Sequence, residues 1–232
     1  MIAKKSPLIS RSVPRAQSIP VAEVPPDLTP EWQREFMAQR RLEAARIPVR
    51  FQSKSFESYK TERHAKRKLV LQAAEAFVSS FNFNAGPPRG LLIEGVVGCG
   101  KTHIAIAILR EVIQKGYTGL YYNMVDLLSD IRSTYGDATE ASESDLLEEV
   151  NAPDLLVLDD LGAEKTSEWV NDRLYLIVNR RYESGKPVVV TTNLSLDELI
   201  RKVGERTVSR LCEICETFAP FPDEDYRRKH MH

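Results

Sequence analysis

The stretch Gly95–Thr102 constrains the fold of this chain more than any other part of its sequence. It reads GVVGCGKT and matches the pattern G-x-x-x-x-G-K-[ST] in full. The mostly apolar residues Leu91–Glu94 precede it, as a strand would, and His103–Lys115 follow it with the apolar spacing of a helix. A glycine-rich turn between a strand and a helix directs backbone N–H groups at an anion. The sequence therefore predicts a phosphate-binding loop in an α/β fold.

The residues of this loop have distinct expected roles. Gly95, Gly98 and Gly100 let backbone N–H groups turn inward around a phosphate, in conformations that a Cβ atom obstructs. Lys101 is expected to place a mobile charge on the β- and γ-phosphates of a nucleotide, and Thr102 to offer its hydroxyl to Mg²⁺. ATP or ADP together with Mg²⁺ is therefore the expected ligand.

Two further residues complete the expected nucleotide-contacting set. Cys99 occupies a variable position of the pattern, where it is either an oxidisable thiol or simply a small residue. His103 follows Thr102 directly, on the first turn of the expected helix. Both residues are expected next to the bound nucleotide.

Two later apolar runs end in polar side chains. Asp159 and Asp160 follow four apolar residues, and Asn193 follows Pro187–Thr192. Because ligands of open α/β sheets bind outside the carboxyl ends of the strands, these side chains are expected near the phosphates. We expect Asp159 to hold Mg²⁺ through its water shell, Asp160 to polarise an attacking water molecule, and Asn193 to position that water. Glu164 is the alternative to Asp160, because an aspartate side chain is short for this task.

Arg206 and Arg210 lie four residues apart, on one face of a predicted helix. Two cations on one face repel each other unless an anion faces them. One expectation is the ATP of a neighbouring subunit, since an arginine supplied in trans stabilises transition-state charge. The alternative is an acidic partner in the same chain, and Glu205, Glu213 and Asp197 are the candidates.

The remaining sequence predicts alternating strands and helices around this site. The expected strands are Leu91–Glu94, Gly119–Asn123, Leu155–Asp159, Pro187–Thr192 and Thr217–Phe221. The expected helices are His103–Lys115, Val125–Tyr135, Glu168–Ser184 and Leu196–Ile214, the last with a break at Gly204. The polar, acidic stretch Gly136–Asp145 is expected as a mobile loop. Short apolar strands separated by helices predict a five-stranded parallel sheet sandwiched by helices, the fold of a P-loop NTPase.

The N-terminal part differs in texture from this core. Residues 1–30 hold six of the 13 prolines and are basic, which predicts a disordered tail. The tail is either an electrostatic tether or a solvated leader. Residues 31–60 are expected as a short helix and a linker, in which the helix docks on a partner or packs against the core, and a further helix is expected from Thr61 to Phe81. Residues 61–227 form the expected ATPase domain and 228–232 a C-terminal tail.

Composition narrows the classes of function. Lys and Arg number 32 against 33 Asp and Glu, which excludes a uniformly basic coat for nucleic acid. No apolar run is long enough to span a bilayer or to resemble a secretory signal. The 3 cysteines suit a reducing compartment, and we expect a cytoplasmic location. The lone pair Cys212 and Cys215 is expected to pack within a helix rather than to bind zinc.

Taken together, the sequence from Ile47 to Arg227 resembles the AAA+ helicase loaders of the DnaC/DnaI type and the related IstB transposition ATPases. The resemblance is carried by IPVRFQSKSFESY, GLLIEGVVGCGKTHIAIAIL, LLVLDDLGAEKTSEW, NRRYESGKPVVVTTNLSLDEL and GERTVSRL. It implies Walker A roles for Lys101 and Thr102 and Walker B roles for Asp159 and Asp160. It further implies a sensor 1 role for Asn193, an arginine-finger role for Arg210 with Arg206 beside it, and a sensor 2 role for Arg227. The loop departs from the family by having Val-Val-Gly-Cys in place of the usual Pro-Pro-Gly-Thr.

The resemblance also implies partners. These are single-stranded DNA, a ring-shaped replicative helicase or a transposase, and further copies of the chain in an ATP-dependent oligomer with slow intrinsic hydrolysis. The region expected at the DNA is Tyr121–Tyr135, with Arg132 and Tyr135 as backbone and stacking contacts. Three other functions are possible alternatives: a regulator of a transposase, a small-molecule kinase, and a module that binds ATP without hydrolysing it.

Overall fold

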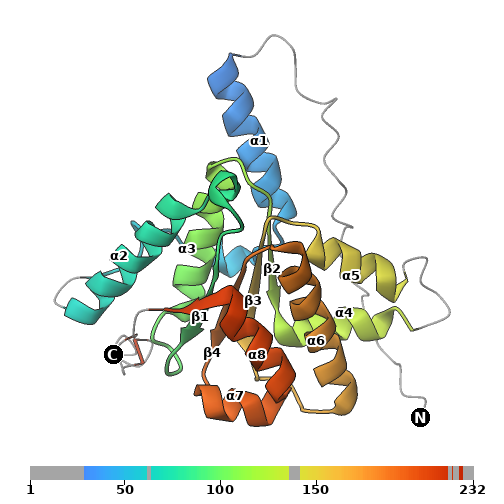
Figure 1. The fold of residues 1–232 in the computed structure, drawn as a ribbon. Helices are drawn as coiled ribbons and strands as arrows, with labels where there is room; N and C mark the ends of the chain where they lie inside the picture. The colour runs from blue at the N-terminus through green and yellow to red at the C-terminus, as the bar shows by residue number, and fades with distance from the viewer. Residues whose placement is uncertain (1–28, 62–63, 136–141, 219–220, 222–224, 227–232) are drawn as a thin grey trace, which may run out of the picture.

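A five-stranded parallel sheet forms the centre of the molecule (Figure 1). The computed structural model describes residues 29–61, 64–135, 142–218, 221, 225 and 226. The strands are β1 (Gly90–Glu94), β2 (Gly119–Asn123), β3 (Leu155–Leu161), β4 (Val188–Thr192) and β5 (Cys215–Thr217). Their spatial order is β2-β3-β4-β1-β5, which places β1 between β4 and β5. The predicted α/β sandwich is confirmed.

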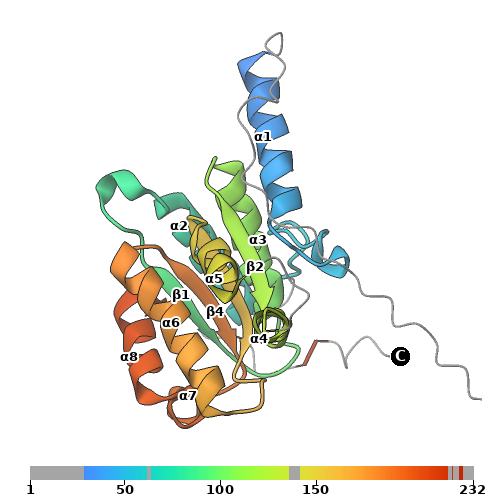
Figure 2. The ribbon, with the colours of Figure 1, turned by 90° about the vertical axis from the view of Figure 1, so that its right-hand side faces the viewer.

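Helices cover both faces of this sheet (Figures 1 and 2). The helices are α1 (Pro30–Ala44), α2 (Ala65–Ser80), α3 (Lys101–Gln114), α4 (Met124–Ser133), α5 (Glu143–Asn151), α6 (Glu168–Ser184), α7 (Leu196–Val203) and α8 (Glu205–Ile214), with single 3₁₀ turns at Val49–Phe51 and Phe83–Ala85. Successive strand residues point to opposite faces, so Leu91 and Ile93 pack with α2 and α3, and Leu92 packs with the layer of α4 to α8. Because both faces of the sheet are buried, each strand must be apolar along nearly its whole length.

Two predicted boundaries were wrong. The stretch Gly136–Asp145 was expected as a mobile loop, but α5 begins within it at Glu143. Ser142 and Asp145 form a capping box, and Leu147 and Val150 bury the apolar side of this helix. Residues 136–141 lie outside the described part.

The last strand was predicted at Thr217–Phe221 but spans Cys215–Thr217. The apolar residues Phe218 and Phe221 serve core packing instead: their rings pack on each other and on the core beside the phosphate loop. Strand β5 pairs with β1 on the outer side of the sheet.

Helix α1 projects from the body of the domain (Figure 1). Thr29 caps it and Pro30 opens it. None of its residues is buried, and Trp32 is 58% exposed. Residues 1–28, which were expected as a basic tail, lie outside the described residues, as do 227–232. Among the described residues no helix has the length and apolar character required to cross a membrane.

The segment between α1 and α2 crosses the start of α3 and packs against the edge strand of the sheet. Its first residue, Ala45, is buried, and its carbonyl oxygen accepts a hydrogen bond of 2.9 Å from the backbone N–H of Tyr121 on the edge strand β2. Further on, Arg110 of α3 donates to the carbonyl oxygen of Gln52 at 2.8 Å. Tyr59 then packs in the same core cluster as α2 and α3. This crossing segment, residues 45–60, therefore lies beside the loop that follows β1.

Candidate functional site

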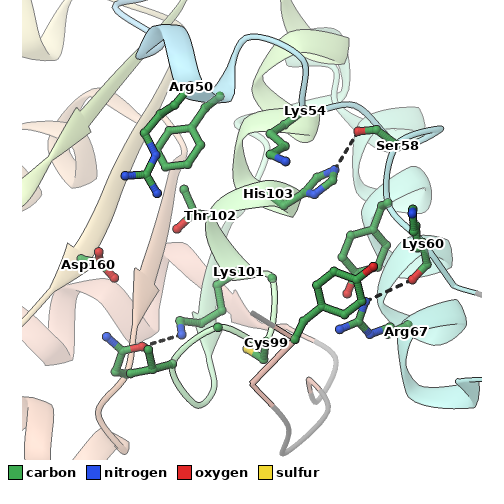
Figure 3. Close-up of a pocket in the computed structure, with 17 residues that line it drawn as sticks. Arg50, Lys54, Ser58, Lys60, Arg67, Cys99, Lys101, Thr102, His103 and Asp160 are labelled. Carbon is green, nitrogen blue, oxygen red and sulfur yellow. Dashed lines mark hydrogen bonds between the residues drawn. The ribbon is translucent and has the colours of Figure 1, made fainter. Parts of the chain in front are cut away.

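A pocket of about 490 Å³ lies where β1, β3 and β4 end (Figure 3). The phosphate loop and the first turn of α3 form its floor. Asp160 and Asn193 reach it from the ends of β3 and β4. The crossing segment and the start of α2 supply the opposite wall. One pocket thus collects the residues that the sequence places in three separate motifs.

Lys101 is the central cation of the pocket and is only 5% exposed. Its Nζ atom donates to the carbonyl oxygens of Gly95 and Val96, at 2.7 and 2.9 Å. It also donates to Oδ1 of Asn193, at 2.6 Å. The loop lysine and the residue at the tip of β4 are therefore in direct contact, although 92 residues separate them.

Asp159 is a buried carboxylate that accepts hydrogen bonds from three hydroxyl groups. Thr191 Oγ1 donates to Oδ1 at 2.7 Å and Tyr121 OH to Oδ2 at 2.8 Å. Thr102 Oγ1 lies 2.9 Å from Oδ1 and 3.1 Å from Oδ2. A carboxylate beside a hydroxyl is a hard oxygen donor set that suits Mg²⁺, so the residues fit the expected metal. The contribution of Tyr121 was not predicted from the sequence.

Asp160 has a backbone conformation that few residues other than glycine adopt, with φ of 59°. The pairing of β3 with β4 shifts register between Leu158 and Leu161, so the strand bulges at this point. The backbone N–H of Asp160 donates to Thr191 Oγ1 at 2.9 Å. The bulge turns Asp160 into the pocket, whereas Asp159 stays buried beneath it.

Glu164, the alternative to Asp160, lies elsewhere. It is 6% exposed, and its Oε2 atom accepts a hydrogen bond of 3.0 Å from the backbone N–H of Gly162. Its Oε1 atom has no hydrogen-bond partner within the described residues, and burial raises the pKa of the carboxyl. It does not line the pocket, so the geometry favours Asp160 as the residue nearer to a bound phosphate.

The glycines of the loop are required by close neighbours. Gly98 and Gly100 have φ of 76° and 111°. A Cβ atom on Gly98 would lie 1.9 Å from Oδ1 of Asp225, and one on Gly100 would lie 3.0 Å from the ring of Tyr59. The backbone N–H of Tyr226 donates to the Gly98 carbonyl oxygen at 3.1 Å. The C-terminal segment therefore packs directly on the loop, and Arg227, which follows it, lies outside the described residues.

The sequence did not predict the cationic wall of this pocket. Among the described residues that line it, five carry a positive charge and one carries a carboxylate, Asp160. The five cationic residues are Arg50, Lys54, Lys60, Arg67 and Lys101. Figure 3 shows the guanidinium of Arg50 on the side of Thr102 and Asp160 and that of Arg67 at the other end. The run IPVRFQSKSFESY carried this information, but only as part of a family likeness.

The end of the pocket near Arg67 is aromatic. The Arg67 guanidinium lies 4.3 Å from the centre of the Tyr226 ring and 5.9 Å from that of Tyr59. His103 meets Tyr59 edge-on, at 5.2 Å between ring centres, and its Nε2 atom lies 2.9 Å from the Ser55 carbonyl oxygen. Burial lowers the pKa of His103. This end suits an uncharged ring system, whereas the end at Lys101 suits an anion.

Cys99 is fully buried beneath the loop. Burial raises the pKa of its thiol, which disfavours the reactive thiolate. The structure therefore favours the interpretation of Cys99 as a small packing residue. Cys212 is exposed on α8 and Cys215 is buried at the start of β5, so the expectation that both pack within a helix was wrong.

The two arginines of α8 have different environments. The Arg210 guanidinium lies 4.0 Å from the centre of the Tyr182 ring, and its Nη1 atom is 3.3 Å from Oε1 of Glu213. The alternative of an acidic partner in the same chain thus holds for Arg210. Arg206 is exposed and makes no hydrogen bond or ion pair with the described residues. Neither arginine lines the pocket of its own chain.

Arg132 and Tyr135 belong to a cluster between α4, α5 and α6. The Arg132 guanidinium lies 4.8 Å from the centre of the Trp169 ring, and the Tyr135 ring meets Trp169 edge-on at 6.2 Å. Arg173 Nη2 donates to Tyr135 OH at 3.1 Å, and Arg173 Nε is 2.5 Å from Oε1 of Glu143. The sequence singled out two members of this cluster and missed Trp169, Arg173 and Glu143.

Comparisons with known proteins agree with this architecture. Residues 28–231 match the family described as IstB-like ATP binding protein. The replicative helicase loader DnaC of Escherichia coli strain K12 is 30% identical over 178 residues, which are 77% of this chain and 71% of DnaC. A crystal structure of the DnaC helicase loader gives a TM-score of 0.67 at 28% identity, over 75% of this chain and 100% of that one.

A third similarity concerns the fold alone. AMPPCP-bound DnaA from Aquifex aeolicus gives a TM-score of 0.58 at 21% identity, over 72% of this chain and 50% of that one. The sheet and its helical layers are therefore arranged as in that protein. Given the family match and the 30% identity to DnaC, the chain belongs to the IstB-like ATP-binding family of AAA+ proteins and is related to the DnaC helicase loaders.

Proposed function

We propose that this chain binds ATP with Mg²⁺ in the pocket above the phosphate loop and hydrolyses it to ADP and phosphate. The observation that carries the proposal is the convergence of Lys101, Thr102, Asp160 and Asn193 on one pocket, with Asp159 buried beneath it and bonded to Thr102. The aromatic end beside Tyr59 is assigned to the base. Gly95, Gly98, Cys99, Gly100 and His103 surround the phosphates and the sugar.

In the proposed reaction the residues of this chain divide the work. Lys101 turns from the loop carbonyls to the β- and γ-phosphates, because a phosphate oxygen is the stronger acceptor for an ammonium group. Thr102 and Asp159 hold Mg²⁺, which neutralises charge that develops on the phosphates. Asp160 accepts a proton from the attacking water, and Asn193 orients that water. Arg227, the residue after Tyr226, is assigned to the γ-phosphate of the ATP that its own chain binds.

Arginines from a second copy complete the proposed site. Arg206 and Arg210 do not reach the pocket of their own chain, so hydrolysis by a single copy is slow. Stacking on Tyr182 holds the plane of the Arg210 guanidinium and leaves N–H groups at its edge for a phosphate. ATP then favours assembly of several copies, and hydrolysis releases them.

The proposed partners are single-stranded DNA and a replicative helicase, in the cytoplasm. DnaC is named as a replicative helicase loader, which supports this choice by likeness. Arg132, Tyr135 and the neighbouring Trp169 ring are proposed as the DNA contacts, since exposed aromatic and cationic groups stack on bases. A transposase is the second candidate partner, because the family match is to IstB-like proteins.

Two measurements test this proposal together. Phosphate release from ATP and the mass of the assembly are followed with and without single-stranded DNA. We expect assembly with ATP but not with ADP, and faster phosphate release on DNA. Release that requires an added phosphate acceptor would establish a kinase instead, and binding without release would establish an ATP-binding module. Recovery of a helicase or a transposase from the host on the immobilised, ATP-bound protein then separates the two partners.

A further inference from the structure

A tyrosine hydroxyl is bonded to the carboxylate that the proposed site assigns to Mg²⁺. Tyr121 OH donates to Asp159 Oδ2 at 2.8 Å, and the two residues are 3% and 2% exposed. The register of the sheet explains the contact. Tyr121 pairs with Val157, so Asp159 lies two residues further along β3 on the same face. Diagonal neighbours at this separation are within reach of an aromatic side chain.

Two contacts other than the hydrogen bond to Asp159 hold Tyr121 in place. Its backbone N–H is bonded to the Ala45 carbonyl oxygen at 2.9 Å, and its ring meets that of Phe51 edge-on at 6.5 Å between centres. Both contacts come from the crossing segment, which also forms the pocket wall. A buried, packed ring has one available orientation, so the hydroxyl is held at the carboxylate.

The three hydroxyl donors to Asp159 are not equivalent. Thr102 is itself assigned to Mg²⁺, whereas Thr191 and Tyr121 each hold one carboxylate oxygen from outside the pocket. We infer that Tyr121 is a positioning residue that fixes the Asp159 carboxylate for Mg²⁺, an inference that rests on the proposed function. Outer groups that orient a metal-binding carboxylate change metal affinity by about 10- to 100-fold when they are removed.

The test compares Tyr121→Phe with Tyr122→Phe. The second tyrosine is the next residue of the same strand, and its hydroxyl bonds Asp130 at 3.3 Å on the opposite face of the sheet. Binding of a fluorescent ADP is measured without metal and then over a Mg²⁺ titration. For Y121F we expect unchanged metal-free affinity and a half-saturating Mg²⁺ concentration raised by about tenfold. For Y122F we expect the wild-type value.

A second pair of variants guards against misfolding of Y121F. Thr191→Val removes both the donor to Oδ1 and the acceptor of the Asp160 backbone N–H, with little change in shape, and Thr191→Ser keeps both. We expect the valine variant to raise the Mg²⁺ requirement and the serine variant to retain the wild-type requirement.

Each outcome decides the inference. Equal Mg²⁺ requirements for Y121F and Y122F overturn it, as does a wild-type protein whose ADP binding is not strengthened by Mg²⁺. If Y121F does not fold, a T191V requirement equal to that of T191S overturns it. A wild-type protein that binds no ADP at all overturns the proposed function and this inference with it.

Discussion

The phosphate-loop side of the molecule and the arginine face of α8 differ in how their polar groups are satisfied. Lys101, Thr102 and Asp159 all find partners within their own chain, from the loop, β2 and β4. On α8, Arg210 lies over the Tyr182 ring and pairs with the neighbouring Glu213, and Arg206 has no hydrogen bond or ion pair with the described residues. In the proposed function, one chain therefore supplies a binding half, and the arginines of α8 form a second half that faces another copy. The proposed function accordingly assigns binding to the single chain and hydrolysis to the assembly.

The largest expected effect separates these two halves. In Arg210→Ala the rate of ATP hydrolysis should fall by about 10³-fold, the lower end of what an arginine supplied in trans contributes. ATP affinity should stay at the wild-type value, because Arg210 does not line its own pocket. The exposed Arg201 on α7 supplies the control, Arg201→Ala. If titration calorimetry showed that R210A had lost ATP affinity, the distinction between the binding half and the arginine half would fail.

Lys101→Ala should act on the other half. Hydrogen bonds from a charged donor to phosphate are strong, so ATP affinity should fall by about 10- to 100-fold. Hydrolysis should fall with it. Lys165→Ala is the matched control, since Lys165 is an exposed lysine that follows β3 and does not line the pocket. Calorimetry that gives K101A the affinity of K165A would place the nucleotide elsewhere.

The stacking of Arg210 on Tyr182 predicts a smaller effect. Tyr182→Leu removes the aromatic face that holds the guanidinium 4.0 Å away, whereas Tyr182→Phe keeps it. We expect a loss of about two- to fivefold in hydrolysis for Y182L, in line with an exposed cation–π contact, and no loss for Y182F. Steady-state phosphate release measures both variants. Equal rates would mean that Tyr182 does not orient the arginine.

The smallest expected effect concerns stability and pH. Burial raises the pKa of Glu164 above its ordinary value of 4.5, so the folded protein binds this proton more tightly than the unfolded chain does. The stabilisation is complete below the ordinary value and is lost as pH rises through the raised one. In Glu164→Gln that loss should be absent. Urea unfolding of both proteins at pH 4.5 and pH 7 measures it, and an identical pH dependence would contradict the assignment.

Much of the fold was readable because its signals are local. The phosphate loop and the break at Gly204 depend on neighbouring residues only. Helix α5 was missed because its acidic first turn resembles a loop, and only the capping box and two buried apolar residues distinguish it. Strand β5 was misplaced because aromatic residues that pack in the core also favour strands.

Only part of the site could be predicted from the sequence, because the other contacts depend on how strands and helices pack together. Polar residues at the ends of strands could be predicted as site residues, because the carboxyl ends of parallel strands lie at one edge of the sheet. Tyr121 lies within an apolar strand, and its contact with Asp159 depends on a register between β2 and β3 that the sequence does not display. The cationic wall depends on how the crossing segment passes over α3, and the environment of Arg210 depends on the packing of α6 against α8.

The most direct test of the shared site mixes two inactive variants. K101A lacks the binding half but carries intact α8 arginines, and R210A has the opposite defect. Each alone should release almost no phosphate from ATP, and an equimolar mixture should recover a measurable fraction of the wild-type rate, because some sites then combine an intact loop with an intact arginine. A mixture that stays inactive, although both variants are folded and associate with each other, would contradict a site shared between copies.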